Sequence, residues 1–169
     1  MRLIITGNSK DGLSTVIQDG PPDTFLVFDP AEDLIVTEPH LVSTDPGTPG
    51  DKGCSSAMLW LTEEGAPAID VSANVGAHAD FIRLGPGGTR WILLRYGAFA
   101  YASPHWSTTL DYDYIVSGSG QLILDECTVE VETGDCIILK AVRHAWRAGP
   151  EGMVLNIVMT GIAAGDEAG

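Results

Sequence analysis

The sequence predicts an all-β protein. Short runs of apolar and β-branched residues recur along the chain, and turn-forming residues separate them. Twenty glycines and ten prolines are spread over the 169 residues, so few windows keep the 3.6-residue period of a helix. Many short strands joined by glycine-containing turns are typical of a β-sandwich or a β-barrel.

The expected strands follow this pattern of apolar runs, which is most regular from residue 89 onward. They are Leu3–Thr6, Ser14–Gln18, Phe25–Phe28, Leu34–Thr37, Ala57–Thr62, Phe81–Leu84, Thr89–Tyr96, Tyr112–Ser117, Gln121–Leu124, Thr128–Glu132, Cys136–Lys140 and Met153–Thr160. Tight turns are expected at Ser117–Gly120, Asp125–Glu126 and Glu132–Asp135. The second turn would close a hairpin between Gln121–Leu124 and Thr128–Val131.

A chain of this length suits one domain, residues 1–169. Within it, residues 1–80 are expected to supply N-terminal strands and loops. Residues 81–162 are expected to form the regular half of a barrel, and residues 163–169 a flexible tail. The segment Ser43–Gly53 has only turn and loop chemistry, so we interpret it as a surface loop within the domain.

Charge, hydropathy and cysteine content exclude several classes of function. The formal net charge of −14 argues against a nucleic-acid partner, because that affinity comes mainly from Lys and Arg. The mean hydropathy is +0.13, and no apolar run approaches the ~20 residues of a membrane span. The N-terminal apolar run breaks at Gly7, too early for a signal peptide, so a cytoplasmic location is expected. The three cysteines form neither a disulfide framework nor a zinc-finger spacing.

The candidate chemistry lies in the C-terminal half. His105 and Asp111 are six residues apart, and an even spacing on one strand would place both side chains on the same face. Gly118 follows and would end that strand in a turn. Gly134 then precedes an apolar strand, and His144 follows Gly134 by ten residues.

These residues resemble the two motifs of the cupin superfamily, G-x5-H-x-H-x3,4-E-x6-G and G-x5-P-x-G-x2-H-x3-N. The closest resemblance is to a bacterial and fungal subgroup, carried by Thr109–Tyr112 and Arg143–Arg147. It is strong over Ser103–Thr160 and weaker in the N-terminal half. The resemblance implies a cupin double-stranded β-helix, a jelly-roll barrel, with extra N-terminal strands.

The resemblance also implies a ligand set for one divalent ion (Fe, Mn, Ni or Zn): His105, Asp111 and His144. Imidazole and carboxylate ligands suit these metals. Two departures weaken the set, since Ser107 stands where many cupins have a second histidine and Asp111 replaces glutamate. A protein without a metal is therefore also compatible with the sequence.

Three functions remain open, because a fold does not specify a function. The first is a metal-dependent dehydratase or isomerase of an oxygenated metabolite, with the ion acting as a Lewis acid. The second is a non-catalytic barrel that binds or senses a small-molecule ligand. The third is a metal-free enzyme in which His144 and Asp111 act as an acid/base pair. Asp113 has the same strand parity as Asp111, which would turn a second carboxyl inward.

A homodimer is also expected. Antiparallel barrels leave strand edges that need protection, and the strands within Leu3–Gln18 could add to the sheet of a second copy. Cupins are often dimers of this kind.

Overall fold

The computed structural model describes residues 2–21, 24–28, 42–43, 54–62 and 84–163. Every regular element in these ranges is a strand, which confirms the all-β prediction. None of these segments is a helix that could cross a membrane. The strands are β1 (Leu3–Asn8), β2 (Ser14–Gly20), β3 (Thr24–Phe28), β4 (Val42–Ser43), β5 (Cys54–Thr62), β6 (Thr89–Tyr96), β7 (Tyr101–His105), β8 (Thr109–Leu124), β9 (Thr128–Glu132), β10 (Cys136–Lys140) and β11 (His144–Gly161).

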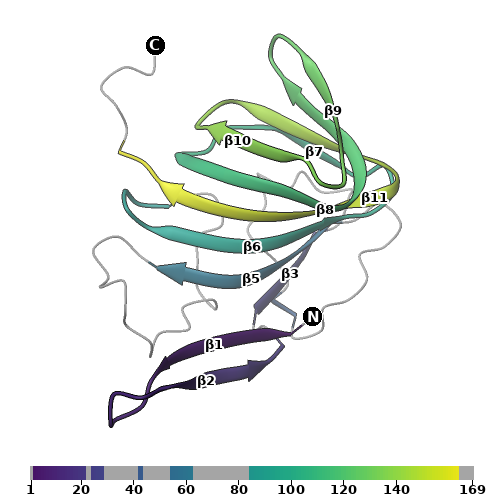
Figure 1. Cartoon of the computed structure of the whole chain (residues 1–169). Coiled ribbons are helices and arrows are strands. Elements are labelled where there is room, and N and C mark those ends of the chain that lie inside the picture. Colours follow the sequence, from purple (N-terminus) through teal and green to yellow (C-terminus); the bar gives the residue numbers. More distant parts are fainter. Residues whose placement is uncertain (1, 22–23, 29–41, 44–53, 63–83, 164–169) are drawn as a thin grey trace.

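The strands form two antiparallel sheets (Figure 1). β1 and β2 make a hairpin of their own. The other strands make one sheet in the order β10-β8-β11-β6-β5-β3-β4, with β7 paired to β11 and β9 paired to β8. This antiparallel arrangement is the one expected for a jelly roll.

The large sheet folds back on itself because β8 and β11 each contribute to two layers. The first half of β8 pairs with β10 and with the second half of β11. The second half of β8 pairs with β9 and with the first half of β11, which also pairs with β7. One apolar core lies between the layers, and it includes Ile115, Leu155, Leu122 and Trp146.

Glycine makes the bend in β8 possible. Before the bend the odd-numbered residues from Thr109 to Ile115 are buried, and after it Gly120 and Leu122 are. This change of parity requires an extra residue in the strand, a β-bulge. Gly118 occupies the bend with φ +82, and a Cβ there would lie 2.2 Å from the carbonyl oxygen of Gly152. Only glycine tolerates both the conformation and the close approach.

β11 bends at the same place. His144, Trp146 and Ala148 are buried before the bend, whereas Met153 and Leu155 are buried after it. The pairing with β8 shifts register between Ala148 and Met153. In both β8 and β11, therefore, the buried residues change once between odd-numbered and even-numbered positions, and each strand contributes to the inward faces of both layers.

Several strand predictions are confirmed and others are corrected. β6, β9 and β10 have the predicted bounds, and so does the hairpin turn at Asp125–Glu126. The turn predicted at Ser117–Gly120 is wrong, because β8 continues through it as a bulge. The strands β4 and β7 were not predicted. Leu34–Thr37 and all of the Ser43–Gly53 loop after Ser43 lie outside the described residues. So does Phe81–Leu84 except Leu84, which is not in a strand.

The β1–β2 hairpin lies on the outer side of the large sheet (Figure 1). Leu3 and Ile5 pack against Ala57 and Leu59 of β5 and against Leu93 of β6. A two-stranded hairpin is marginal alone, so this contact stabilises it.

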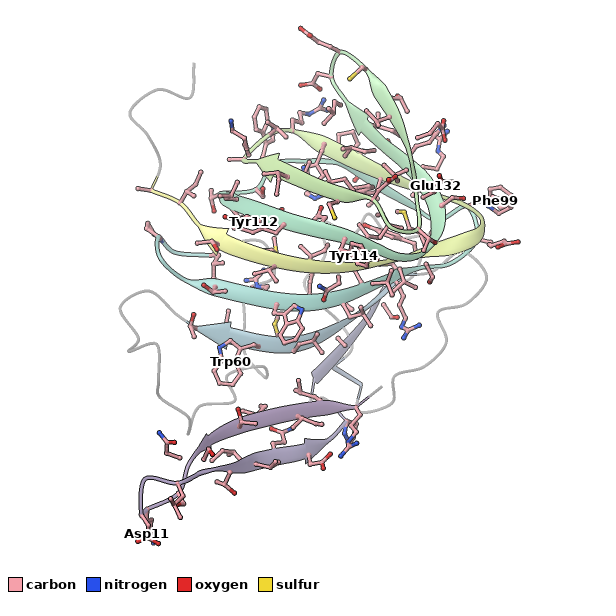
Figure 2. The ribbon with its side chains drawn as sticks, in the orientation of Figure 1. Asp11, Trp60, Phe99, Tyr112, Tyr114 and Glu132 are labelled. Atoms are coloured by element: carbon pink, nitrogen blue, oxygen red, sulfur yellow. The ribbon has the colours of Figure 1, made fainter. Side chains whose placement is uncertain are left out.

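Large apolar side chains are exposed on the outer face of the sheet as well. They include Tyr112 and Tyr114 of β8 (Figure 2) and Ile138 of β10.

The homodimer remains a prediction. Light scattering at micromolar concentration should give about twice the mass of one chain, and a mass of 17.9 kDa would contradict it.

Candidate active site

Two histidines meet where the second layer begins. β7 ends at His105 and β11 begins at His144, and the two residues are paired in the ladder between these strands. Their ring centroids are 4.3 Å apart, with the ring planes at 57°. His144 is buried and His105 is partly buried. The structure therefore brings together two of the three predicted site residues.

A backbone carbonyl orients each imidazole. The Nδ1 atom of His105 lies 2.9 Å from the oxygen of Ser103, and Nδ1 of His144 lies 2.9 Å from the oxygen of Val142. A carbonyl oxygen can only accept a hydrogen bond, so Nδ1 carries the proton in both rings. In the neutral rings the lone pair is then on Nε2, where it is available to a metal ion or a proton.

Both rings are held neutral. Burial lowers the pKa of His105, and neighbouring His144 lowers it further, against a smaller opposing effect of the Ser103 carbonyl and Asp111. Burial likewise lowers the pKa of His144, opposed by its bond to the Val142 carbonyl. Neutral imidazole is the form that binds metals and accepts protons.

The carboxyl groups come from β8. Asp111 and Asp113 are both 4% exposed, and Thr109, two residues earlier on the same face, is 1% exposed. The prediction that Asp113 faces inward is confirmed. The prediction that His105 and Asp111 share one strand is wrong, because β7 ends at His105 and residues 106–108 connect it to β8. Asp111 nevertheless lies close enough to His105 to interact with it electrostatically.

Burial shifts both carboxyl groups toward the protonated form. It raises the pKa of Asp113 to about 8, with a further contribution from the charge of Asp111. It also raises the pKa of Asp111, where the Thr109 hydroxyl, His105 and Arg90 oppose the shift. Oδ1 of each aspartate is buried with no hydrogen-bond partner among the described residues, and so is Oγ1 of Thr109.

Arg90 is a site residue that sequence reasoning missed. It is 1% exposed on β6, and Met159 of β11 lies between it and Asp111 in the cross-strand register. Its charge favours the ionised form of Asp111. Strand alternation could have identified Arg90, because it is two residues from the apolar Ile92 in a regular strand pattern and therefore points to the same inward face.

The three candidate ligands are of chemical types that bind divalent ions. They are two neutral imidazoles with Nδ1 bonded to carbonyls, and a buried carboxyl oxygen without a partner. Within the described ranges, no group of three or more His, Cys, Asp or Glu is placed to hold a metal ion. Binding one ion through His105, Asp111 and His144 would therefore require these groups to lie closer together than they do here.

The buried Asp113 carboxyl makes a prediction about pH. The native protein keeps a proton on Asp113 up to about pH 8, whereas the unfolded chain, with its ordinary pKa of 3.8, has lost it. The native state thus binds more protons, and the free energy of unfolding should fall as pH rises from 6.5 to 8, by at most about 1.4 kcal/mol per unit. Below pH 6.5 the two histidines act in the opposite sense, since their lowered pKa values let the unfolded chain take up protons first.

Urea unfolding in the presence of a chelator, at pH 6.5 and pH 8, measures this effect. The Asp113→Asn variant should show a shallower dependence over the same interval, because it has no proton to release. An equal slope in the variant and the wild type would contradict the assignment.

Comparisons with known proteins find distant structural likenesses at low sequence identity. No protein-family model matches the sequence, and no curated protein matches it. A conserved Streptococcus pyogenes protein of unknown function is 16% identical, with a TM-score of 0.46 over 68% of this chain and 79% of that one. An RmlC-like cupin from Shewanella frigidimarina is 16% identical, with a TM-score of 0.42 over 67% of this chain and 79% of that one. KdgF from Halomonas sp. is 12% identical, with a TM-score of 0.43 over 63% of this chain and 77% of that one. The structural neighbours thus include a protein described as an RmlC-like cupin.

Proposed function

We propose that this chain is a small-molecule enzyme, a metal-dependent dehydratase or isomerase that moves a proton on an oxygenated metabolite. His105, Asp111 and His144 are its working residues. One observation carries the proposal: two neutral imidazoles, each fixed by a backbone carbonyl, lie 4.3 Å apart, and one of them, His105, interacts electrostatically with the buried Asp111 carboxyl. Perturbed titratable groups gathered in one interior are typical of active sites.

His144 is suited to the role of general base. Its Nδ1–H bond to the Val142 carbonyl fixes the ring and leaves Nε2 to accept a proton from the carbon next to a substrate carbonyl. Burial favours the neutral ring, so the base is in its active form at neutral pH.

Asp111 is suited to return a proton. Burial raises its pKa, which favours the protonated form that a general acid needs. In a dehydration, the C–H proton passes to Nε2 of His144, and Asp111 gives its proton to the departing hydroxyl group, which leaves as water. In an isomerisation, Asp111 gives its proton to a different substrate atom.

In the metal-dependent version, His105, Asp111 and His144 would hold a divalent ion, and the ion would polarise the substrate carbonyl as a Lewis acid. The acid/base roles of His144 and Asp111 belong to the metal-free protein, because a ligating Nε2 has no lone pair left for a proton. Burial between the two layers keeps bulk water away from His144 and Asp111, which are each 4% exposed. Electrostatic effects on the reacting atoms are stronger in such a site than in water.

A metal-free acid/base enzyme is the second candidate. It is favoured by the finding that, in the described part of the chain, no three potential ligands are placed to hold an ion. In this version His144 acts as the base and Asp111 as the acid.

Proton exchange tests the enzyme function before the natural substrate is known. The purified chain is incubated in D2O with a panel of neutral hydroxyketones and hydroxyaldehydes, and loss of the carbon-bound proton is followed by ¹H NMR. The wild type should exchange or dehydrate at least one compound. His144→Ala and Asp111→Asn should each slow that reaction by about 100-fold or more, since general acid–base catalysis contributes this much.

Tyr112→Phe is the matched control, because Tyr112 lies on the outward face of the same strand and is 47% exposed. It should react like the wild type. Full activity in His144→Ala would contradict the proposal. Activity that survives removal of metal by a chelator would favour the metal-free version.

A further inference from the structure

The inward face of β8 has a series of polar groups that the reaction does not fully use. Thr109, Asp111 and Asp113 are alternate residues on this face and are each at least 96% buried, and we call them the acceptor stripe. At about 3.4 Å per residue, the stripe extends over roughly 13 Å. Oδ1 of both aspartates and Oγ1 of Thr109 have no partner at hydrogen-bond distance among the described residues, although the Thr109 hydroxyl lies near enough to Asp111 to lower the pKa of its carboxyl.

The neighbouring strands do not supply donors for the aspartates. Asp111 lies between Leu139 of β10 and Met159 of β11 in the register. Asp113 lies between Ile137 and Ile157 in the same way. Apolar side chains on both sides offer nothing to bond with, so any partner must come from the interior between the layers.

Leaving such groups without partners is costly. Each buried polar atom that lacks a hydrogen bond destabilises a protein by about 1–3 kcal/mol. Three of them in consecutive inward positions on one strand therefore point to a bound molecule that supplies the missing donors.

We infer that the acceptor stripe binds the hydroxyl groups of an uncharged polyhydroxylated substrate. The inference rests on the proposed function and names its substrate class. Hydroxyl groups donate to carboxyl and hydroxyl oxygens, and a carbon chain with a hydroxyl on each carbon presents several donors along its length. Asp111 is the middle residue of the stripe, so a substrate aligned along it contacts the proposed proton donor.

An anionic substrate fits this interior less well. Arg90 is the only cationic side chain among the buried residues that the structure describes, apart from the neutral His144. Asp111 already interacts with that charge. A carboxylate only accepts hydrogen bonds, so it would supply no donor to the unpartnered oxygens of the stripe.

Calorimetry with polyols tests this inference separately from the chemistry. Xylitol, with five hydroxyl groups and no carbonyl, is titrated into the full-length protein at pH 7, with pentane-1,5-diol and xylonate as comparisons. Xylitol should bind at least about tenfold more tightly than either, because the diol lacks most of the donors and xylonate is an anion. Thr109→Val, which keeps the shape and removes the hydroxyl, should weaken xylitol binding by a few fold to about tenfold.

Asp113→Leu should weaken xylitol binding by a similar factor, and Thr109→Val alone decides the matter if Asp113→Leu does not fold. Tyr112→Phe is again the control and should bind like the wild type. Xylitol binding no tighter than that of the diol would overturn the inference, and so would wild-type affinity in Thr109→Val. Xylitol binding without proton exchange on any carbonyl compound would support the substrate class and contradict the proposed reaction.

Discussion

The His144→Ala variant is expected to lose transition-metal binding while it keeps its fold. His144 would supply one of only three ligands, and even groups that merely orient a ligand change metal affinity by about 10–100-fold. Removal of the ligand itself should therefore weaken binding by more than about 100-fold. Folding should survive, because β11 pairs with β8 on both sides of its bend and with β6 beyond it.

Metal content after dialysis against Fe, Mn, Ni or Zn measures this effect, with circular dichroism as the check on folding. Ser107→His tests the same geometry from the opposite direction. Position 107 stands where many cupins have a second histidine, and Oγ of Ser107 is buried without a hydrogen-bond partner in the described part of the chain. A fourth ligand there should raise the affinity. Wild-type metal content in folded His144→Ala would contradict the ligand assignment.

The Gly118→Ala variant is expected to show the largest loss of stability. Its φ of +82 costs an alanine about 1–2 kcal/mol, and the new Cβ would also lie 2.2 Å from the Gly152 oxygen and 3.0 Å from the Met153 Cα. Both are backbone atoms, so β8 and β11 would have to separate at the bend that folds the sheet into two layers. The two layers carry the site residues, so the site should be lost with the bend.

Gly134→Ala is the matched control for this prediction. Gly134 also has a positive φ, +101, but a Cβ there would meet nothing within 4 Å. Urea unfolding should show that Gly118→Ala loses at least about 2 kcal/mol more than Gly134→Ala, since the second variant has only the conformational cost. Failure of Gly118→Ala alone to fold would agree with this expectation. Equal losses in the two variants would contradict it.

The sequence predicted the strands whose pattern is local. β6, β9 and β10 have regular apolar patterns, and turns set off β9 and β10 on both sides, so their bounds were predicted correctly. The bend in β8 was taken for a turn, because Gly118 looks the same locally in either structure. Only the pairing of β8 with β11 makes it a bulge. β7 was missed because it contains Pro104, which argues against a strand. Among the described strands β7 pairs only with β11, and a strand paired on one side tolerates proline.

The site was predicted in part. The meeting of His105 and His144 followed from family resemblance, and the structure produces it through the pairing of β7 with β11. The inward direction of Asp113 followed from strand parity. The argument that placed Asp111 beside His105 wrongly assumed that the two residues share a strand. Arg90 was missed because the family motif does not include β6. Contacts between distant strands depend on the topology, which local patterns do not show.

The metal content of the purified full-length chain tests the central claim most directly. If His105, Asp111 and His144 form a metal centre, elemental analysis should find about one divalent transition-metal ion per chain, removable by a chelator and restored by dialysis against the metal. The absence of any bound transition metal, both as purified and after dialysis against Fe, Mn, Ni and Zn, would contradict it.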